Sequence, residues 1–297
     1  MRETLEFLGI ASPGIILLFL FNYLPMFGVI IAFKNYNPNL GIIGSKWNGL
    51  QNFKFFFTSP DAVRVIRNTV LYALDFMFVV LAFAVILALM FYALKNRIAL
   101  KIYNTIAILP KFLSMVLIAY IVYAFLNPVS GILNKFLTLF GNDEMIDWYS
   151  KPGAWPFILT IVKVWQTVGM QSIIYYAALM SIDEALFEAA SIDGATKLQQ
   201  VWYISIPHLI PVMTIQTILA FGSIFSGDFG LFYQTTMDVG TLYPTTDIIN
   251  TYVFRGLKNG NMSVSGAIGL VQSVLGLIMV IIVNTVVKKI SPENSLF

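Results

Sequence analysis

Cysteine is absent from the 297 residues, and the chain has a single histidine, His208. Without thiols the chain forms no disulfide bonds, has no thiol nucleophile and cannot hold a metal through cysteine. One imidazole likewise excludes a metal cluster built from histidines. His208 directly follows a proline, where we expect an interfacial or helix-starting residue rather than a pH switch. We therefore predict no metal site.

Charged residues are also scarce, at 11% of the chain, whereas hydrophobic residues make up 58% and the mean hydropathy is +0.79. So little polar surface excludes a soluble globular protein. A helix needs about 20 apolar residues to cross a bilayer. Stretches of that length lie at residues 8–33, 69–94, 103–126, 156–180, 209–233 and 264–287. The sequence therefore predicts an all-α polytopic membrane protein with six transmembrane helices.

Motifs for nucleotide binding and catalysis are missing as well. Gly194-Ala195-Thr196-Lys197 lacks the spacing and the following hydroxyl residue of a phosphate-binding loop. No Ser/His/Asp arrangement or positioned pair of carboxylates indicates an enzyme. The net charge of +3 does not indicate a nucleic-acid partner, because the basic residues lie at the ends of the spans. We predict a non-catalytic chain without a cofactor of its own.

The predicted organisation is a single membrane domain over residues 1–297, because no linker, charge block or low-complexity tract divides the chain. Residues 34–68 are rich in Asn and Gly before an aromatic run, which predicts a turn-rich loop leading into an interfacial helix. Residues 127–155 and 234–262 are expected on the same outer face. In the last span, Ser265, Gly269 and Ser273 recur every four residues and favour close helix packing.

A spaced motif lies between the fourth and fifth spans: Glu188-Ala189-Ala190, then Gly194, then Ile204-Ser205-Ile206-Pro207. Ser181-Ile182-Asp183-Glu184 matches a capping box, which predicts a short helix from there through Ala190. Asp193-Gly194 provides the permissive backbone that ends this helix. A second short helix is expected to follow.

The two short helices have the composition of a docking element. Glu184 and Glu188 lie one turn apart and offer a negative face. Leu198, Val201 and Trp202 fall at i, i+3 and i+4, an apolar face suited to a helix lying in a groove. The alternative is an amphipathic connector lying at the lipid surface.

The spaced motif resembles the EAA loop through which permease subunits of ABC importers contact their ATPases. Ile206 departs from that pattern, which has Leu at this position. Further blocks along nearly the whole chain are similar to carbohydrate-uptake ABC permeases, specifically the polysaccharide or lipo-oligosaccharide branch of the maltose-permease relatives. These blocks are Asn22 to Met26, Ile31 to Asn37, Trp47 to Phe53, Arg67 to Thr69, Leu109 to Phe112, Trp165 to Gly169 and Ile248 to Arg255.

The resemblance implies a type I ABC importer permease fold in a bacterial cell membrane, with both termini cytoplasmic. It implies a second, different permease, two ATPase subunits that bind ATP and Mg, and an extracellular sugar-binding protein or lipoprotein. The substrate would be an oligosaccharide, moved by alternating access. ATPase coupling is predicted for the cytoplasmic loop, about 181–208, at Glu184, Glu188, Ala189, Ala190, Asp193, Gly194, Ala195, Leu198 and Pro207.

Polar side chains inside the spans are candidates for the substrate pathway, because such groups are costly in lipid and face a bundle interior or water. The resemblance implies sugar contacts in the fourth span and the middle of the fifth. The predicted pathway residues are Asp75, Lys163, Gln166, Thr167, Met170, Gln171 and Asp228. Five of them, from Lys163 to Gln171, share one face of the fourth span at i, i+3, i+4, i+7 and i+8.

Structural roles are the alternative for these residues. Interhelical hydrogen bonds that hold the bundle are as consistent with the pattern as sugar contacts are. Asp75 and Lys163 lie at similar depths, so an ion pair between them is an alternative to substrate contact. Lys111, near the inner end of the third span, is expected to extend to the lipid headgroups.

The predicted orientation conflicts with the charge count, because more basic residues fall outside than inside when the N-terminus is cytoplasmic. We still predict this orientation, because the loop at 181–208 must face the ATPase. Two other functions remain open: an ABC permease for another small solute, and a stand-alone secondary transporter. The latter needs a buried ion relay, and the ionisable residues inside the spans form no evident chain.

Overall fold

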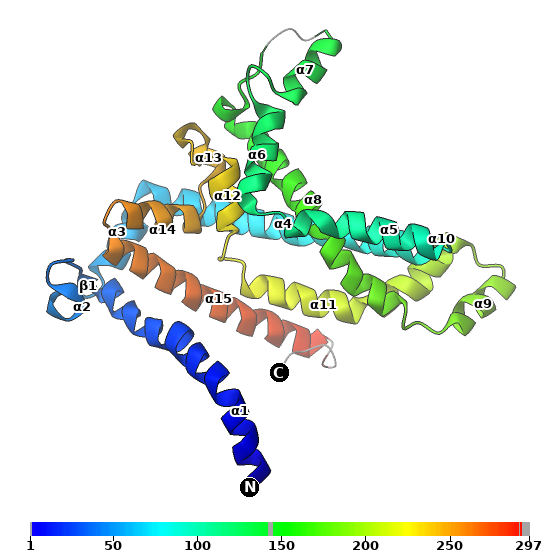
Figure 1. Ribbon diagram of the computed structural model, residues 1–297, viewed down its shortest axis with the longest axis horizontal. Coiled ribbons are helices and arrows are strands. Elements are labelled where there is room, and N and C mark those ends of the chain that lie inside the picture. Colours follow the sequence, from blue (N-terminus) through cyan, green and yellow to red (C-terminus); the bar gives the residue numbers. More distant parts are fainter. Residues whose placement is uncertain (1, 142–144, 291, 293–297) are drawn as a thin grey trace. The chain divides into compact units, whose positions relative to one another are not determined.

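The computed structural model describes residues 2–141, 145–290 and 292, and helices dominate it (Figure 1). The chain divides into two compact units, Met1–Val63 with Tyr252–Val274 and Arg64–Thr251 with Leu275–Phe297. The divisions fall within three helices: α4 (Pro60–Ala93), α14 (Ile249–Lys258) and α15 (Met262–Ile290). The prediction of one domain stays a prediction.

The first unit begins with a long helical segment, which is followed by a small two-stranded hairpin. The segment comprises α1 (Arg2–Leu18), a π-helical turn (Phe19–Tyr23) and a 3-10 stretch (Leu24–Phe33). β1 (Lys34–Asn35) pairs antiparallel with β2 (Lys46–Trp47), and α2 (Gly41–Gly44) lies between them. The expected helix follows as α3 (Gln51–Thr58), and Asn52 Nδ2 donates to the carbonyl of Ala32 (2.8 Å). Its interfacial position stays a prediction.

The second unit holds most of the apolar helices. Its elements after α4 are α5 (Arg97–Ile108), α6 (Met115–Leu126), α7 (Ile132–Leu139), α8 (Trp155–Leu179), α9 (Glu184–Ile192), α10 (Lys197–Gln200), α11 (Ile206–Gly222), α12 (Phe229–Thr235) and α13 (Tyr243–Thr246). Short 3-10 turns lie at Leu109–Phe112, Trp148–Ser150, Pro152–Ala154 and Gly240–Leu242, and a π-helical turn lies at Val201–Ser205. α7 and α9 lie beyond opposite ends of α8 in Figure 1.

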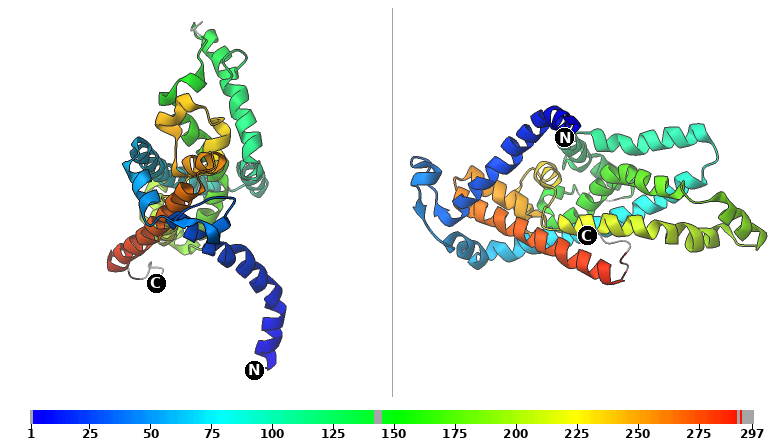
Figure 2. Two further views of the ribbon diagram at one scale, coloured as in Figure 1. Left: turned by 90° about the vertical axis from the view of Figure 1, so that its left-hand side faces the viewer. Right: turned by 90° about the horizontal axis from the view of Figure 1, so that it is seen from below.

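Helix α8 is the centre of the second unit, and α5 and α11 both pack against it (Figure 2). Gly169 permits the approach of α5, because a Cβ there would overlap the carbonyl oxygen of Ala107. One buried core, including Ile118, Trp155 and Phe232, joins α4, α6, α8 and α12. A second, including Ala88, Leu179 and Leu209, joins α4, α8 and α11. These cores fix the helices that carry the polar side chains described below.

Five described helical segments are long and apolar enough to cross a membrane: Gly9–Phe33, Pro60–Ala93, Pro152–Leu179, Lys197–Gly222 and Met262–Lys289. The sixth candidate is a pair, Arg97–Phe112 and Met115–Leu126, bent by 99°. The span expected at 103–126 therefore corresponds to this bent pair and not to one straight helix. Pro110 lies in the 3-10 turn before the bend, and the Ser114 hydroxyl then caps α6 by accepting from the Leu117 amide (3.3 Å).

The span expected at 209–233 is interrupted as well. Helix α11 ends at Gly222, and α12 begins only at Phe229, with Asp228 as its N-cap. Both π-helical turns in the described residues directly precede a proline-containing helical segment. The ring of Pro25 or Pro207 would clash with the carbonyl four residues earlier in a regular α-helix, and a widened turn relieves this clash.

Candidate functional site

The first candidate site is the segment at 181–208, which connects α8 to α11 through α9 and α10. Helix α9 begins at Glu184, and the Asp183 carboxylate caps it by accepting from the Ala185 amide (3.0 Å). The predicted capping box at Ser181-Ile182-Asp183-Glu184 is therefore wrong, since the cap comes from Asp183. The helix also extends two residues beyond the predicted end, to Ile192.

Gly194 forms the turn between α9 and α10. Its φ is +80°, a conformation that residues with a Cβ rarely adopt. The amide of Ala195 then donates to the carbonyl of Ala190 (2.9 Å), which closes the end of α9. The predicted backbone break at this glycine is confirmed.

A capping box that the sequence reasoning missed begins α10. The Thr196 hydroxyl accepts from the amide of Gln199 (3.3 Å), and the Gln199 side chain accepts from the amide of Thr196 (2.7 Å). The Thr-x-x-Gln spacing is visible in the sequence. From this cap the helical run continues through Pro207 into α11, as one apolar segment from Lys197 to Gly222.

Side-chain contacts hold α10 against α9. The buried amide of Gln200 donates to the Ser191 hydroxyl (2.7 Å) and to the carbonyl of Phe187 (3.3 Å). The Phe187 ring in turn lies 5.8 Å from the ring of Tyr92 on α4. The segment is therefore tied both to itself and to the helical bundle.

The outward surface of this segment combines apolar and acidic groups. Ile192, Leu198 and Trp202 are 86%, 67% and 61% exposed. All the predicted coupling residues reach the surface of this segment. Two of them, Ala190 and Ala195, are partly exposed, and the others are exposed: Glu184, Glu188, Ala189, Asp193, Gly194, Leu198 and Pro207. A large apolar surface rimmed by charge is typical of a protein-binding site.

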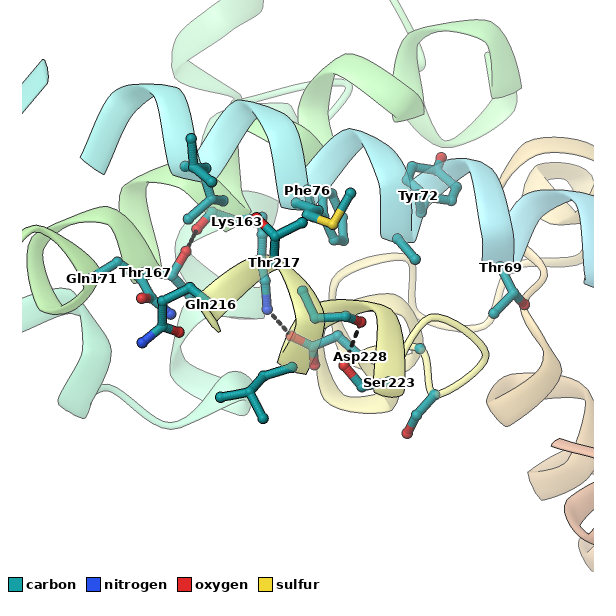
Figure 3. Close-up of a pocket in the computed structure, with 18 of the residues that line it drawn as sticks. Thr69, Tyr72, Phe76, Lys163, Thr167, Gln171, Gln216, Thr217, Ser223 and Asp228 are labelled. Atoms are coloured by element: carbon teal, nitrogen blue, oxygen red, sulfur yellow. Dashed lines mark hydrogen bonds and ion pairs between the residues drawn. The ribbon is translucent and has the colours of Figure 1, made fainter. Parts of the chain in front are cut away.

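The second candidate site is a cavity of about 420 Å³ between α4, α8, α11 and α12, lined by both polar and apolar side chains (Figure 3). It receives four of the predicted pathway residues: Lys163, Thr167, Gln171 and Asp228. Lys163 Nζ forms an ion pair with Asp228 Oδ2 at 2.7 Å, and the Thr167 hydroxyl donates to the Lys163 carbonyl at 2.7 Å. Lys111 also lines the cavity, instead of only extending to the headgroups as expected.

The other three predicted pathway residues lie outside the lining of this cavity. The Asp75 carboxylate accepts from the Thr160 hydroxyl (2.5 Å), so the expected ion pair of Asp75 with Lys163 is not the one formed. Gln166 is buried against Met115, with Nε2 3.4 Å from Sδ, and Met170 is 47% exposed. Only part of the predicted polar face of α8 therefore faces the cavity.

Aromatic and hydroxyl side chains complete the lining, and the sequence reasoning missed most of them. Tyr72 and Phe76 of α4 and Phe232 of α12 form a cluster with ring centroids 4.6 to 6.1 Å apart. Thr217 and Ser223 add hydroxyls (Figure 3). Aromatic residues inside apolar helices carry no sequence signal that separates a cavity wall from a packed core. The cavity offers amides, hydroxyls, charges and ring faces, the groups that bind sugar hydroxyls and apolar sugar faces.

A bundle of apolar helices with a partly polar cavity and an exposed segment of apolar and acidic groups is typical of a membrane transport subunit. The chain belongs to the family of binding-protein-dependent transport system inner membrane components, which matches residues 80–292. It is therefore a permease subunit of an ABC importer, a multi-pass membrane protein with the type I permease fold. The resemblance seen in the sequence is confirmed.

Two proteins of Bacillus subtilis are similar along most of the chain. The polygalacturonan/rhamnogalacturonan transport system permease protein YteP is 33% identical over 284 residues, covering 95% of this chain and 87% of that protein. Protein LplB is 34% identical over 285 residues, covering 95% of this chain and 88% of that protein.

Solved structures give the same family likeness. A chain in the crystal structure of a bacterial ABC transporter involved in the import of the acidic polysaccharide alginate matches with a TM-score of 0.88 at 30% identity. The match covers 98% of this chain and 97% of that chain. A second crystal structure, of a bacterial alginate transporter in complex with its alginate pentasaccharide-bound periplasmic protein, matches with a TM-score of 0.87 at 30% identity, covering 98% and 96%.

Proposed function

We propose that the chain forms one half of the membrane pathway of an ATP-driven oligosaccharide importer. Its similarity to permeases named for polygalacturonan and alginate transport supports a saccharide substrate. The amides, hydroxyls and aromatic rings of the cavity suit such a ligand. A second permease completes the pathway, and a separate extracellular binding protein delivers the sugar.

The segment at 181–208 is the mechanical element of this proposal, because internal contacts hold its shape and its outer surface is exposed. A lever needs a shape held by internal contacts and a surface open to a partner. Helices α9 and α10 are joined by side-chain hydrogen bonds and have an exposed surface, which supports this role. We place this segment in the cytoplasm, seated in one of two ATPase subunits that bind ATP and Mg. The segment couples to nucleotide state only if it binds the open and closed ATPase dimers unequally.

Alternating access follows from that coupling. Closure of the ATPase dimer moves α9 and α10, and the continuous helical run from Lys197 to Gly222 conveys the movement to the cavity wall. Gln216 and Thr217 of that run line the cavity. The chain itself performs no chemistry in this scheme, because hydrolysis takes place on the partner.

Reversing the charge of Glu188 tests the docking role of the segment. We expect Glu188→Arg to lower sugar uptake and sugar-stimulated ATPase activity by about tenfold or more, because a misplaced charge in an interface costs several kcal/mol. The side chain is exposed, so the variant keeps the internal contacts of α9. Both activities are measured with the assembled transporter and its binding protein in proteoliposomes.

Lys135→Glu on the exposed side of α7 is the matched control, since it reverses a charge at the other end of α8. Copurification of the ATPase with each variant separates failed assembly from failed coupling. Normal uptake and normal ATPase stimulation in Glu188→Arg contradict the proposed lever.

A further inference from the structure

The ion pair of Lys163 and Asp228 differs from a buried structural pair in its access to solvent. Their side chains are 20% and 22% exposed, and both line the cavity (Figure 3). The Arg64–Asp247 pair of the same unit has an Asp247 side chain of 0% exposure, with a further bond from the Thr251 hydroxyl (2.9 Å). The Lys163 and Asp228 side chains are therefore partly open to the cavity, whereas the Asp247 side chain is closed off.

The Asp228 carboxylate has a hydrogen bond that remains when its ion pair with Lys163 is broken. Its Oδ2 contacts Lys163, whereas its Oδ1 accepts from the amide of Leu231 (3.1 Å) and caps α12. The capping bond does not depend on the ammonium. Separating the pair therefore leaves a carboxylate that is still hydrogen-bonded and still reached by water, which avoids the large cost of an orphaned buried charge.

The charges of the cavity wall do not balance. Lys111, Lys163 and Asp228 are the charged residues that line it, which leaves one positive charge in excess. Among the described residues no carboxylate lies within ion-pair distance of Lys111. An uncompensated cation in a low-dielectric wall attracts an anionic ligand and disfavours a cationic one.

We infer that Lys163 exchanges carboxylates during transport, releasing Asp228 to bind an acid group of the passing saccharide. The inference rests on the proposed function and adds a chemical class to it: saccharides that carry carboxylates, such as uronate oligomers. Lys163 is then the residue that selects the charge of the substrate. Between transport events the Lys163 ammonium is paired with the Asp228 carboxylate, so no unpaired ammonium remains at this position of the cavity wall.

The test compares an oligogalacturonate with its methyl ester, which has the same linkages and lacks the negative charges. Uptake of each is measured by the assembled transporter in proteoliposomes, with the binding protein titrated to saturation by each sugar. The ratio of the two rates is the readout, because the amount of folded transporter cancels. The variants are Asp228→Asn, which frees Lys163, and the double variant Lys163→Gln with Asp228→Asn, which leaves no unpaired charge.

For the double variant we expect the ratio of acidic to esterified uptake to fall by about tenfold, since a charge-assisted hydrogen bond is lost for one substrate only. Asp228→Asn alone is expected to keep or raise the ratio. Lys135→Gln, outside the cavity, controls for a general change of charge. Equal losses for both sugars in both variants mean that the pair only holds α8 to α12, and overturn the inference. Uptake of neither sugar by the unmodified complex contradicts the proposed saccharide function instead.

Discussion

Single residues of the second unit decide how α13 and α14 are attached to α4. The guanidinium of Arg64 donates to Asp247 Oδ2 (2.9 Å), and Asn68 Nδ2 donates to the carbonyl of Asp247 (3.0 Å). The Thr69 hydroxyl accepts from the amide of Ile249 (2.9 Å). One turn of α4 thereby satisfies the polar groups of the chain between α13 and α14.

This network predicts an asymmetry between two substitutions. Arg64→Met removes the guanidinium that pairs with the buried Asp247 carboxylate, which costs about 3 to 5 kcal/mol. Asp247→Asn leaves Arg64, whose side chain is 29% exposed and can turn to water, so we expect a smaller loss of about 1 to 2 kcal/mol. Thermal unfolding in detergent, followed by the loss of monodisperse protein, gives the order of the melting temperatures.

The double variant Arg64→Met with Asp247→Asn is the control. It removes the guanidinium and the carboxylate together, so it should melt above Arg64→Met alone. Equal melting temperatures for the two single variants contradict the assigned roles.

The sequence predicted which residues of the cavity are ionisable, but not how they pair. Lys163 and Asp228 were both recognised as costly inside a membrane, and the structure brings them together. The expected partner Asp75 lies at a depth similar to that of Lys163, yet it binds Thr160 instead. Depth follows from residue number, whereas pairing depends on how each helix is rotated about its axis, which an almost uniformly apolar composition does not specify.

At the scale of the element, apolar length predicted the spans well where the helix is regular. Residues 156–180 and 264–287 agree closely with α8 and α15. Hydrophobicity does not report bends, so apolar length alone does not locate the breaks near Ser114 and after Gly222. The local signals were present: Pro110 with a capping Ser114, and Gly227-Asp228 before α12. Caps and prolines locate such breaks better than hydropathy does.

The capping box at Thr196 predicts a local effect on the start of α10. Thr196→Val removes the hydroxyl that accepts from the Gln199 amide, a loss of about 1 kcal/mol. We expect hydrogen exchange of that amide to accelerate by about fivefold. Thr196→Ser should restore the protection, because serine caps equally well. Hydrogen exchange by mass spectrometry on peptides covering residues 196–201 measures both.

Thr138→Val is the matched control. The Thr138 hydroxyl donates to the carbonyl of Lys135 (2.7 Å) and caps no helix start, so exchange in α10 should not change. Unaltered exchange in Thr196→Val shows that α10 is held by its contacts with α9 alone.

At the scale of the whole molecule, composition and the spaced motif predicted the class, and the family match confirmed it. Sidedness is the part that sequence statistics address least well. The positive-inside rule counts basic residues near span ends, but this permease uses Arg64 in a buried pair and Lys163 in a cavity, and Lys34 donates to the carbonyl of Ile42 (2.7 Å). Because these cations form specific contacts within the protein, their positions do not indicate which side of the membrane they face.

The absence of cysteine allows sidedness to be tested directly, because any introduced thiol is unique. Ile192 of α9 is 86% exposed and Leu139 of α7 is 81% exposed. Helices α9 and α7 lie beyond opposite ends of α8 (Figure 1). With the chain expressed without its ATPase, we expect a membrane-impermeant maleimide to label Leu139→Cys in intact cells and Ile192→Cys only in inverted vesicles. Both should label fully after solubilisation, which controls for thiol reactivity. Labelling of Ile192→Cys from outside intact cells places α9 away from any cytoplasmic ATPase, and the proposed coupling then fails whatever the sugar specificity proves to be.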